Sequence, residues 1–122
     1  MRYYLTSPSL DIEEKETIRK LSNRLRLAGH DVYIPMEHEV ENGWDLTETE
    51  WARKKFADDM EAIRKCDEVI CIYYGLYNDN TTAWECGFAC GLNKVVNIVN
   101  FINDEVKITI VNGKNSLDKF QK

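Results

Sequence analysis

The sequence predicts an α/β fold: a single small doubly wound domain, flavodoxin-like or Rossmann-like, with a mostly parallel four- to five-stranded sheet flanked by helices. Short apolar runs alternate along the chain with longer segments of helical periodicity. The run at 95–99 is rich in valine and isoleucine, which is typical of a strand buried on both faces. The 122 residues are 43% hydrophobic, and we expect one domain, 1–122, around one core.

The N-terminal part is predicted to form a strand, a helix and a second strand. Residues 2–6 are a β-prone run, and the strand at 31–35 is closed by a proline. Between them, 11–28 has helical spacing and a glycine at its end. The buried positions of this helix are expected to be Ile18, Leu21 and Leu25.

The middle of the chain is predicted to hold a long loop and a second helix. The polar loop at 36–46 is long for a small domain, and such loops are more often functional than idle. Thr47 and Glu50 have the spacing of a capping box, which would open a helix that ends near residue 65. The buried stripe of this helix is expected to be Ala52, Phe56, Met60 and Ile63.

The rest of the chain is predicted to form strands at 68–74 and 94–100 around a helix at 82–92. The segment 106–111 would form either a fifth strand or an extended arm. Small residues share one stripe of the helix, so we expect this stripe to lie against the sheet and Glu85 to lie off the buried face. The stripe consists of Ala83, Cys86, Gly87 and Cys90.

Charge and composition exclude several classes of function. The net charge is -5 and no basic cluster occurs, so we expect no binding of nucleic-acid polymers, which are held by runs of lysine and arginine. A small neutral or cationic ligand suits this charge better. No apolar run approaches the roughly 18 residues that span a bilayer, and the N-terminus has no signal-like apolar region. We therefore expect a cytoplasmic protein without membrane attachment.

The cysteine pattern does not indicate a metal centre. The four cysteines have no CxxC spacing, and neither histidine lies near them in sequence, so we expect no metal and no cofactor. Each cysteine falls in an apolar stripe or strand. We expect all four to be reduced core thiols rather than catalytic or disulfide-bonded residues, namely Cys66, Cys71, Cys86 and Cys90.

The segment 79–89 carries the strongest chemical signal. Glu85 falls in the first turn of the helix predicted at 82–92, where the positive end of the helix dipole favours an ionised carboxylate. A fixed, ionised carboxylate beside a crevice has the properties of a covalent nucleophile. Alternatively, Thr82 and Glu85 form a capping box, in which Glu85 only binds its own helix start.

A crevice is expected where the loops after the first and third strands converge, beyond the carboxyl ends of parallel strands. The first strand contains Tyr4 and leads to Ser7 and Pro8, while the loop after the third strand contains Asp79. The helix that follows this loop would bring Glu85 to the same crevice as Tyr4.

Other residues are candidates for the crevice because of their positions. Asp58 and Asp59 lie in the middle of the helix at 47–65, and Asp59 adjoins its apolar stripe, so we expect one of the pair to point at the crevice. Trp44 and Tyr77 fall in predicted loops and are expected to line the pocket.

Three motifs in this order resemble those of the nucleoside 2-deoxyribosyltransferases, and the resemblance covers about residues 3–99. The motifs are Tyr4-Leu-Thr-Ser-Pro8, then Asp59-Met-Glu-Ala-Ile63 followed by Cys66-Asp67, then Asp79 six residues before Glu85-x-Gly87-x-Ala89.

The resemblance implies a role for each of four residues. Glu85 would be the nucleophile, Tyr4 would hold its carboxylate, Asp59 would assist the base and Asp79 would bind the sugar hydroxyls. The substrates would be a deoxynucleoside and a free nucleobase. A carboxylate can trap C1′ as a glycosyl ester, as in retaining glycosidases, and attack by a second base then restores the β configuration.

The resemblance also implies a homo-oligomer in which a neighbouring subunit completes each pocket. Near the C-terminus, Asn112 or Asn115 would supply the amide that relatives lend to the adjacent site. After the second strand, where related sequences often carry an amide that touches the base, this chain has Glu37, His38 and Glu39. Carboxylates there would favour bases with exocyclic amines.

The chain also departs from the family pattern in two turns. Thr81 stands where the family often has a glycine, and a β-branched residue does not readily adopt positive φ. In the first loop, Pro8 is followed by Ser9 and Leu10 instead of an aromatic residue, which would enlarge the pocket near the base.

Two other functions remain open at this point. One is an N-glycosidase in which water resolves the ester, acting on deoxynucleosides or on their 5′-monophosphates. The charge of Asp79 would repel a phosphate and so favours nucleosides. The other is a non-catalytic nucleoside-binding or nucleotide-binding module, because doubly wound domains of this size also include sensors.

Overall fold

The computed structural model describes residues 1–7, 12–74, 80–102 and 105–112 and confirms the predicted α/β fold. The elements, in chain order, are β1 (Arg2–Thr6), α1 (Ile12–Leu27), β2 (Asp31–Tyr33), the 3-10 turns η1 (Pro35–Glu37) and η2 (Gly43–Asp45), α2 (Glu48–Lys65), β3 (Glu68–Tyr74), α3 (Asn80–Gly91), β4 (Val95–Ile102) and β5 (Glu105–Val111).

The five strands form one sheet in the order β2-β1-β3-β4-β5. Strands β1 to β4 are parallel, and β5 pairs antiparallel with β4, so the segment predicted as a strand or an arm is a strand. Because β1 and β3 are neighbours, with Tyr4 paired to Val69, their carboxyl ends lie side by side. The site is built at this edge of the sheet.

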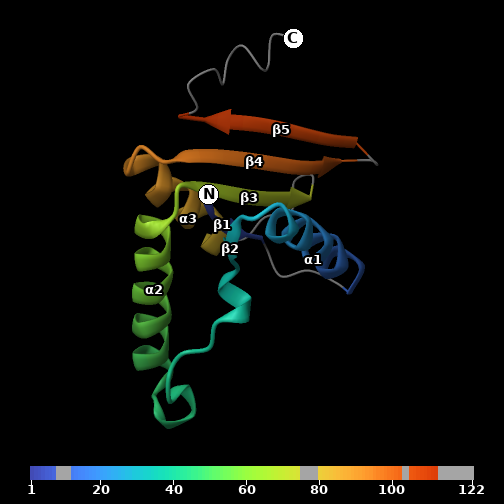
Figure 1. The fold of residues 1–122 in the computed structure, drawn as a ribbon. Helices are drawn as coiled ribbons and strands as arrows, with labels where there is room; N and C mark the ends of the chain where they lie inside the picture. The colour runs from blue at the N-terminus through green and yellow to red at the C-terminus, as the bar shows by residue number, and fades with distance from the viewer. Residues whose placement is uncertain (8–11, 75–79, 103–104, 113–122) are drawn as a thin grey trace.

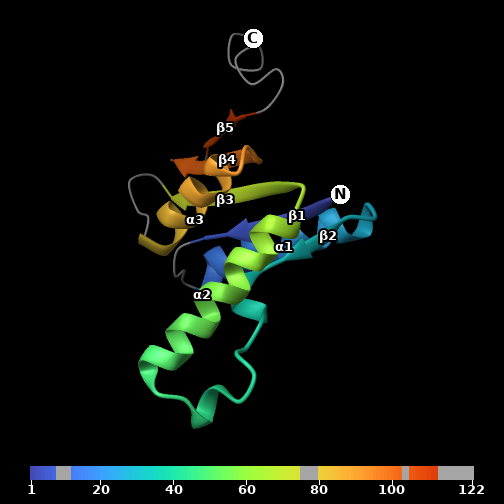
Figure 2. The same cartoon turned by 90° about the vertical axis from the view of Figure 1, so that its left-hand side faces the viewer.

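The sheet has a core on each face, and α1 covers the face opposite to α2 and α3 (Figures 1 and 2). Alternate residues of β1 point to opposite faces. Tyr4 therefore belongs to the core with α2 and α3, whereas Leu5 packs with Ile18 of α1. The predicted buried positions of α1 are confirmed, since Leu21 and Leu25 also pack against this second core.

The predicted buried stripe of α2 is wrong in its N-terminal half. Ala52 and Phe56 are exposed, Met60 is half-buried and Ile63 is fully buried. The reason is geometric, because the N-terminal half of α2 extends past the sheet (Figures 1 and 2) and has no core to pack against. The predicted cap of this helix is confirmed: the Thr47 hydroxyl accepts a hydrogen bond from the Glu50 amide.

The predicted stripe of α3 is also wrong. Ala83 and Gly87 are exposed, and the buried face consists of Thr82, Glu85, Cys86 and Ala89. Glu85 was expected off this face. It is buried because hydroxyl groups of β1 bind its carboxylate, as described below, so the polar group keeps partners in the interior.

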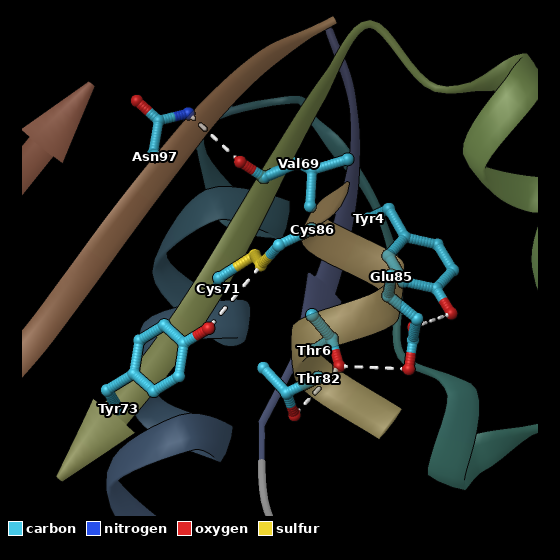
Figure 3. Close-up of a disulfide and its surroundings, with 9 residues drawn as sticks. All are labelled: Tyr4, Thr6, Val69, Cys71, Tyr73, Thr82, Glu85, Cys86 and Asn97. Carbon is cyan, nitrogen blue, oxygen red and sulfur yellow. Dashed lines mark hydrogen bonds between the residues drawn. A yellow bond between two sulfur atoms is a disulfide. The ribbon is translucent and has the colours of Figure 1, made fainter. Parts of the chain in front are cut away.

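The prediction of four reduced cysteines is wrong for two of them. Cys71 of β3 and Cys86 of α3 form a disulfide (Figure 3), and their Cα atoms are 6.7 Å apart. Packing of α3 on β3 brings the two side chains together, a long-range contact that sequence spacing does not reveal. Cys66 and Cys90 are free thiols.

In the part of the chain that the structure describes, none of the helices has the length and apolar character that a membrane span requires.

Candidate active site

A cavity of about 800 Å³ lies beyond the carboxyl end of β1, next to α2 and the segment that follows β2. Its walls combine three acids and one lysine with aromatic and apolar groups. The polar and aromatic lining residues are Thr6 at the end of β1 and Ser7 after it, His38, Glu39 and Trp44 after β2, Trp51, Lys55 and Asp59 on α2, and Glu85 on α3.

Glu85 is held in the wall of this cavity by hydroxyl groups of β1 (Figure 3). Its side chain is 1% exposed. The Tyr4 hydroxyl donates a hydrogen bond to Oε2, and the Thr6 hydroxyl donates one of 3.3 Å to Oε1. The Thr82 hydroxyl lies 3.5 Å from that of Thr6. Both carboxylate oxygens are therefore oriented from across the helix–sheet interface.

The predicted capping box at the start of α3 does not form. The helix begins at Asn80, two residues before Thr82, so Thr82 lies inside the helix and is not its N-cap. For the same reason, Glu85 lies beyond the first turn, where the sequence had placed it. Hydrogen bonds from Tyr4 and Thr6, more than the helix terminus, define the setting of this carboxylate.

Tyr4 is suited to remain a hydrogen-bond donor. Burial, followed by the charge of Glu85 and the hydrogen bond to it, raises the pKa of the Tyr4 phenol well above its usual value. The ring stacks on Tyr33 with centroids 5.5 Å apart, and Tyr33 stacks on His38 at 4.0 Å. This aromatic stack connects the loop after β2 to the residue that binds Glu85.

Asp59 is the member of the acidic pair that lines the cavity. It is 4% exposed, whereas Asp58 is exposed to solvent. Burial raises the pKa of the Asp59 carboxyl, and the ammonium of Lys55, 3.4 Å from Oδ1, lowers it in part. The net effect is upward, so this carboxyl holds a proton at higher pH than an ordinary aspartate does.

The other predicted site residues are distributed unevenly. Ser7, Glu39 and Trp44 line the cavity, and Trp44 is 84% exposed at its rim. Glu37 lies outside the cavity because its carboxylate pairs with Arg26 at 2.7 Å. Four further candidates lie outside the described residues, namely Pro8, Tyr77, Asp79 and Asn115.

Asn112 occupies a structural position among the described residues. Its side-chain amide donates to the carbonyl groups of Cys90 and Lys94, so it ties the end of β5 to the end of α3. Its φ of 60° is the left-handed conformation that asparagine tolerates better than most residues. The side-chain amide of Asn112 is therefore bound to carbonyl groups of its own subunit.

Three of the polar and aromatic residues of the cavity were not among the predicted site residues, namely Thr6, Trp51 and Lys55. The indole of Trp51 lies against Gly43 of η2. A Cβ atom at Gly43 would lie 3.1 Å from Trp51 Cδ1, so a larger residue at this position would require a small shift of the indole. No local sequence signal indicated this contact, because Trp51 belongs to α2 and Gly43 to the loop before it.

A comparison with protein-family models identifies the family. Residues 3–119 match the model described as nucleoside 2-deoxyribosyltransferase. This chain belongs to that family. The resemblance in the three sequence motifs is thereby confirmed. Among the curated proteins, no match was found.

Solved structures agree with the family assignment. The 2-deoxyribosyltransferase from Bacillus psychrosaccharolyticus is 30% identical, with a TM-score of 0.70, over 88% of this chain and 77% of that one. Two others share the fold at lower identity. A CMP N-glycosidase from Clostridium botulinum is 22% identical, with a TM-score of 0.58, over 82% of this chain and 71% of that one. A conserved protein from Enterococcus faecalis V583 is 18% identical, with a TM-score of 0.63, over 79% of this chain and 60% of that one.

Thr81, which stands where the family often has a glycine, lies within α3, because the helix begins at Asn80. Thr81 lies in the first turn of the helix, and it is not among the described residues with positive φ. A glycine is therefore not required at this position.

Within 1–7, 12–74, 80–102 and 105–112, no group of three or more histidine, cysteine, aspartate or glutamate side chains is placed to hold a metal ion.

Proposed function

We propose that this protein transfers 2-deoxyribose between nucleobases through a covalent glycosyl ester on Glu85. The observation that supports it most strongly is the Glu85 carboxylate, buried in the cavity wall with a hydroxyl donor on each oxygen. Family membership and the 30% identical deoxyribosyltransferase support the reaction class and the substrates, a deoxynucleoside and a free nucleobase.

In the first step, a Glu85 oxygen forms a bond to C1′ while the bond from C1′ to the base nitrogen breaks. The electron pair of that bond leaves with the base, and the Asp59 carboxyl donates a proton to the departing ring. Charge builds on C1′ as in an oxocarbenium ion, and the carboxylate traps it. The products are the free base and the glycosyl ester.

In the second step, a nitrogen of the incoming base attacks C1′ and the ester bond to Glu85 breaks. Asp59, now ionised, accepts the proton that the incoming base loses. The donors Tyr4 and Thr6 stabilise the carboxylate as it is released. Each step inverts C1′, so the product keeps the β configuration of the substrate.

The charges in the cavity favour nucleosides over their 5′-monophosphates. Glu39, Asp59 and Glu85 line it, and Lys55 is the only lysine or arginine among the described lining residues. With Asp59 protonated, the carboxylates of Glu39 and Glu85 still oppose a phosphate, because like charges in a partly buried site repel strongly. Glu39 at the rim offers acceptor atoms to the exocyclic amine of a base such as adenine or cytosine.

Hydrolysis is the alternative outcome of the same chemistry. The rim of the cavity is formed by the exposed Trp44, so water can reach the ester if no base occupies the site. In that case the protein is an N-glycosidase. A binding module without turnover is the third possibility, and the same experiment separates all three.

The experiment incubates the protein with deoxyinosine and free adenine and follows the products by chromatography. We expect deoxyadenosine and hypoxanthine, and loss of both in Glu85→Ala. Glu61→Ala, which changes an exposed acid of α2, is the matched control and should retain activity. Hypoxanthine with free deoxyribose alone would indicate the glycosidase, and absence of turnover would indicate a binding module.

We also propose a homo-oligomer whose neighbouring subunit completes each pocket, as the sequence resemblance implies. Light scattering at several protein concentrations gives the subunit number. A monomer that turns over deoxynucleosides at full rate would contradict this part of the proposal.

A further inference from the structure

Lys55 makes three contacts at the edge of the cavity. Its ammonium donates hydrogen bonds to the carbonyl oxygens of Pro35, at 2.7 Å, and His38, at 2.9 Å. The third neighbour is Asp59 Oδ1 at 3.4 Å, one helical turn along α2. A lysine ammonium has three donors, and the two carbonyl groups use two of them, while the contact with Asp59 is an ion pair. Lys55 is therefore placed to orient these protein groups.

The two carbonyl groups belong to the turn that forms one wall of the cavity. Pro35–Glu37 is the 3-10 turn η1, and His38 follows it. The turn itself holds only two short-range hydrogen bonds among the described residues, from Glu37 to Ile34 and from His38 to Pro35. Lys55 fastens this segment to α2, and the side chain is 18% exposed, which strengthens charged hydrogen bonds.

The same turn connects to the nucleophile through the aromatic stack. The His38 ring lies on Tyr33, Tyr33 lies on Tyr4, and the Tyr4 hydroxyl binds Glu85. Displacement of His38 would therefore loosen the support behind Tyr4. Lys55 contacts Asp59 directly. It affects Glu85 only indirectly, because it binds the carbonyl of His38, whose ring begins the stack.

We propose that Lys55 is the positioning residue of the site, which fastens the turn at 35–38 to α2 and keeps Asp59 able to both release and take up a proton. This inference rests on the proposed function, in which Asp59 acts as an acid in one step and as a base in the next. A buried carboxyl without a nearby cation would keep its proton and would serve the second step poorly.

The other charged or titratable groups around Asp59 do not replace Lys55. Asp58 on α2 and Glu85 on α3 are acids, and the phenols Tyr4 of β1 and Tyr33 of β2 are influenced by the charge of Asp59. His38 contributes a weaker positive influence from the loop. Among these groups, Lys55 has the largest effect that opposes the rise in the pKa of Asp59 caused by burial.

The test compares Lys55→Met, Lys55→Arg and Lys54→Met, the last of which removes an exposed lysine next in sequence as a control. In Lys55→Met we expect kcat/KM to fall about tenfold, as for loss of one charged hydrogen bond. The alkaline limb of its pH profile should move to higher pH, because Asp59 loses its cation. Lys55→Arg should return the limb towards its original position. Lys54→Met should leave both kcat/KM and the position of the limb unchanged.

Hydrogen exchange provides a readout that does not depend on turnover. The amides of Glu37 and His38 should exchange faster in Lys55→Met than in the original protein or in Lys54→Met, because the turn has lost its link to α2. An unchanged pH limb together with unchanged exchange would overturn the proposal. If the original protein shows no turnover, the proposed function fails. Exchange and an NMR titration of the Asp59 carboxyl then still decide the role of Lys55.

Discussion

At the residue scale, the two buried acids of one cavity have different partners. Glu85 accepts hydrogen bonds from hydroxyl groups on both oxygens, whereas Asp59 lies beside a single cation and burial raises the pKa of its carboxyl. Environments that differentiate two carboxyl groups in this way assign one to attack and the other to proton transfer. The division of roles that we propose therefore rests on hydrogen bonding and burial, although both residues are simple acids in the sequence.

Tyr4→Phe removes the donor to Glu85 Oε2 and keeps the stacked ring. We expect kcat/KM for base exchange to fall by about 10- to 100-fold, as for loss of a hydrogen bond to a charged group. Steady-state kinetics measure this change in kcat/KM. Tyr3→Phe is the matched control, since Tyr3 packs with the opposite core and should leave the rate unchanged. Equal losses in the two variants would show that the Tyr4 hydroxyl has no special role.

Asp59 predicts a specific pH dependence. Burial raises the pKa of its carboxyl, so the protonated form that donates to the leaving base persists to higher pH than for an ordinary aspartate. Activity should be full below this raised pKa and should fall as pH rises through it. In Asp59→Asn we expect a rate about 10²- to 10⁴-fold lower, without this limb. A profile of kcat/KM against pH with the same limb in both proteins would assign it to another group.

At the scale of elements, the sequence predicted which segments are helices and strands better than which faces they bury. The cap at Thr47 and the whole of β3 agree with the prediction. The buried face of α3 does not, because the small residues Ala83 and Gly87 suggested close packing on a stripe that leaves Glu85 outside. Its burial depends on Tyr4 and Thr6, which are about eighty positions away, and local periodicity cannot reveal such partners.

The disulfide between β3 and α3 is testable without an activity assay. Protein prepared without reductant and unfolded in denaturant should show two reactive thiols, Cys66 and Cys90. Reduction should expose two more and lower the free energy of unfolding by about 3 kcal/mol, as for a loop of this length. Thiol titration and denaturant melts measure both effects. Four reactive thiols before reduction would restore the prediction made from the sequence.

At the scale of the molecule, the fold supplies the site by placing β1 beside β3 and α2 and α3 on one face of the sheet. Alternation of strands and helices predicted the parallel sheet, and the three family motifs indicated the acids. The loop after β2 was expected at the site, but the contribution of Lys55 and Trp51 to the same wall was not predicted. It depends on how α2 projects past the sheet, and no sequence periodicity encodes this projection.

The central claim is that Glu85 forms a bond to C1′ during turnover. The most direct test mixes the protein with a deoxynucleoside in the absence of acceptor base, stops the reaction rapidly in acid and maps peptides by mass spectrometry. We expect one deoxyribosyl group on the peptide that contains Glu85, absent in Glu85→Gln and lost again when free base is added before quenching. Turnover without any adduct, or an adduct on another residue, would contradict the account.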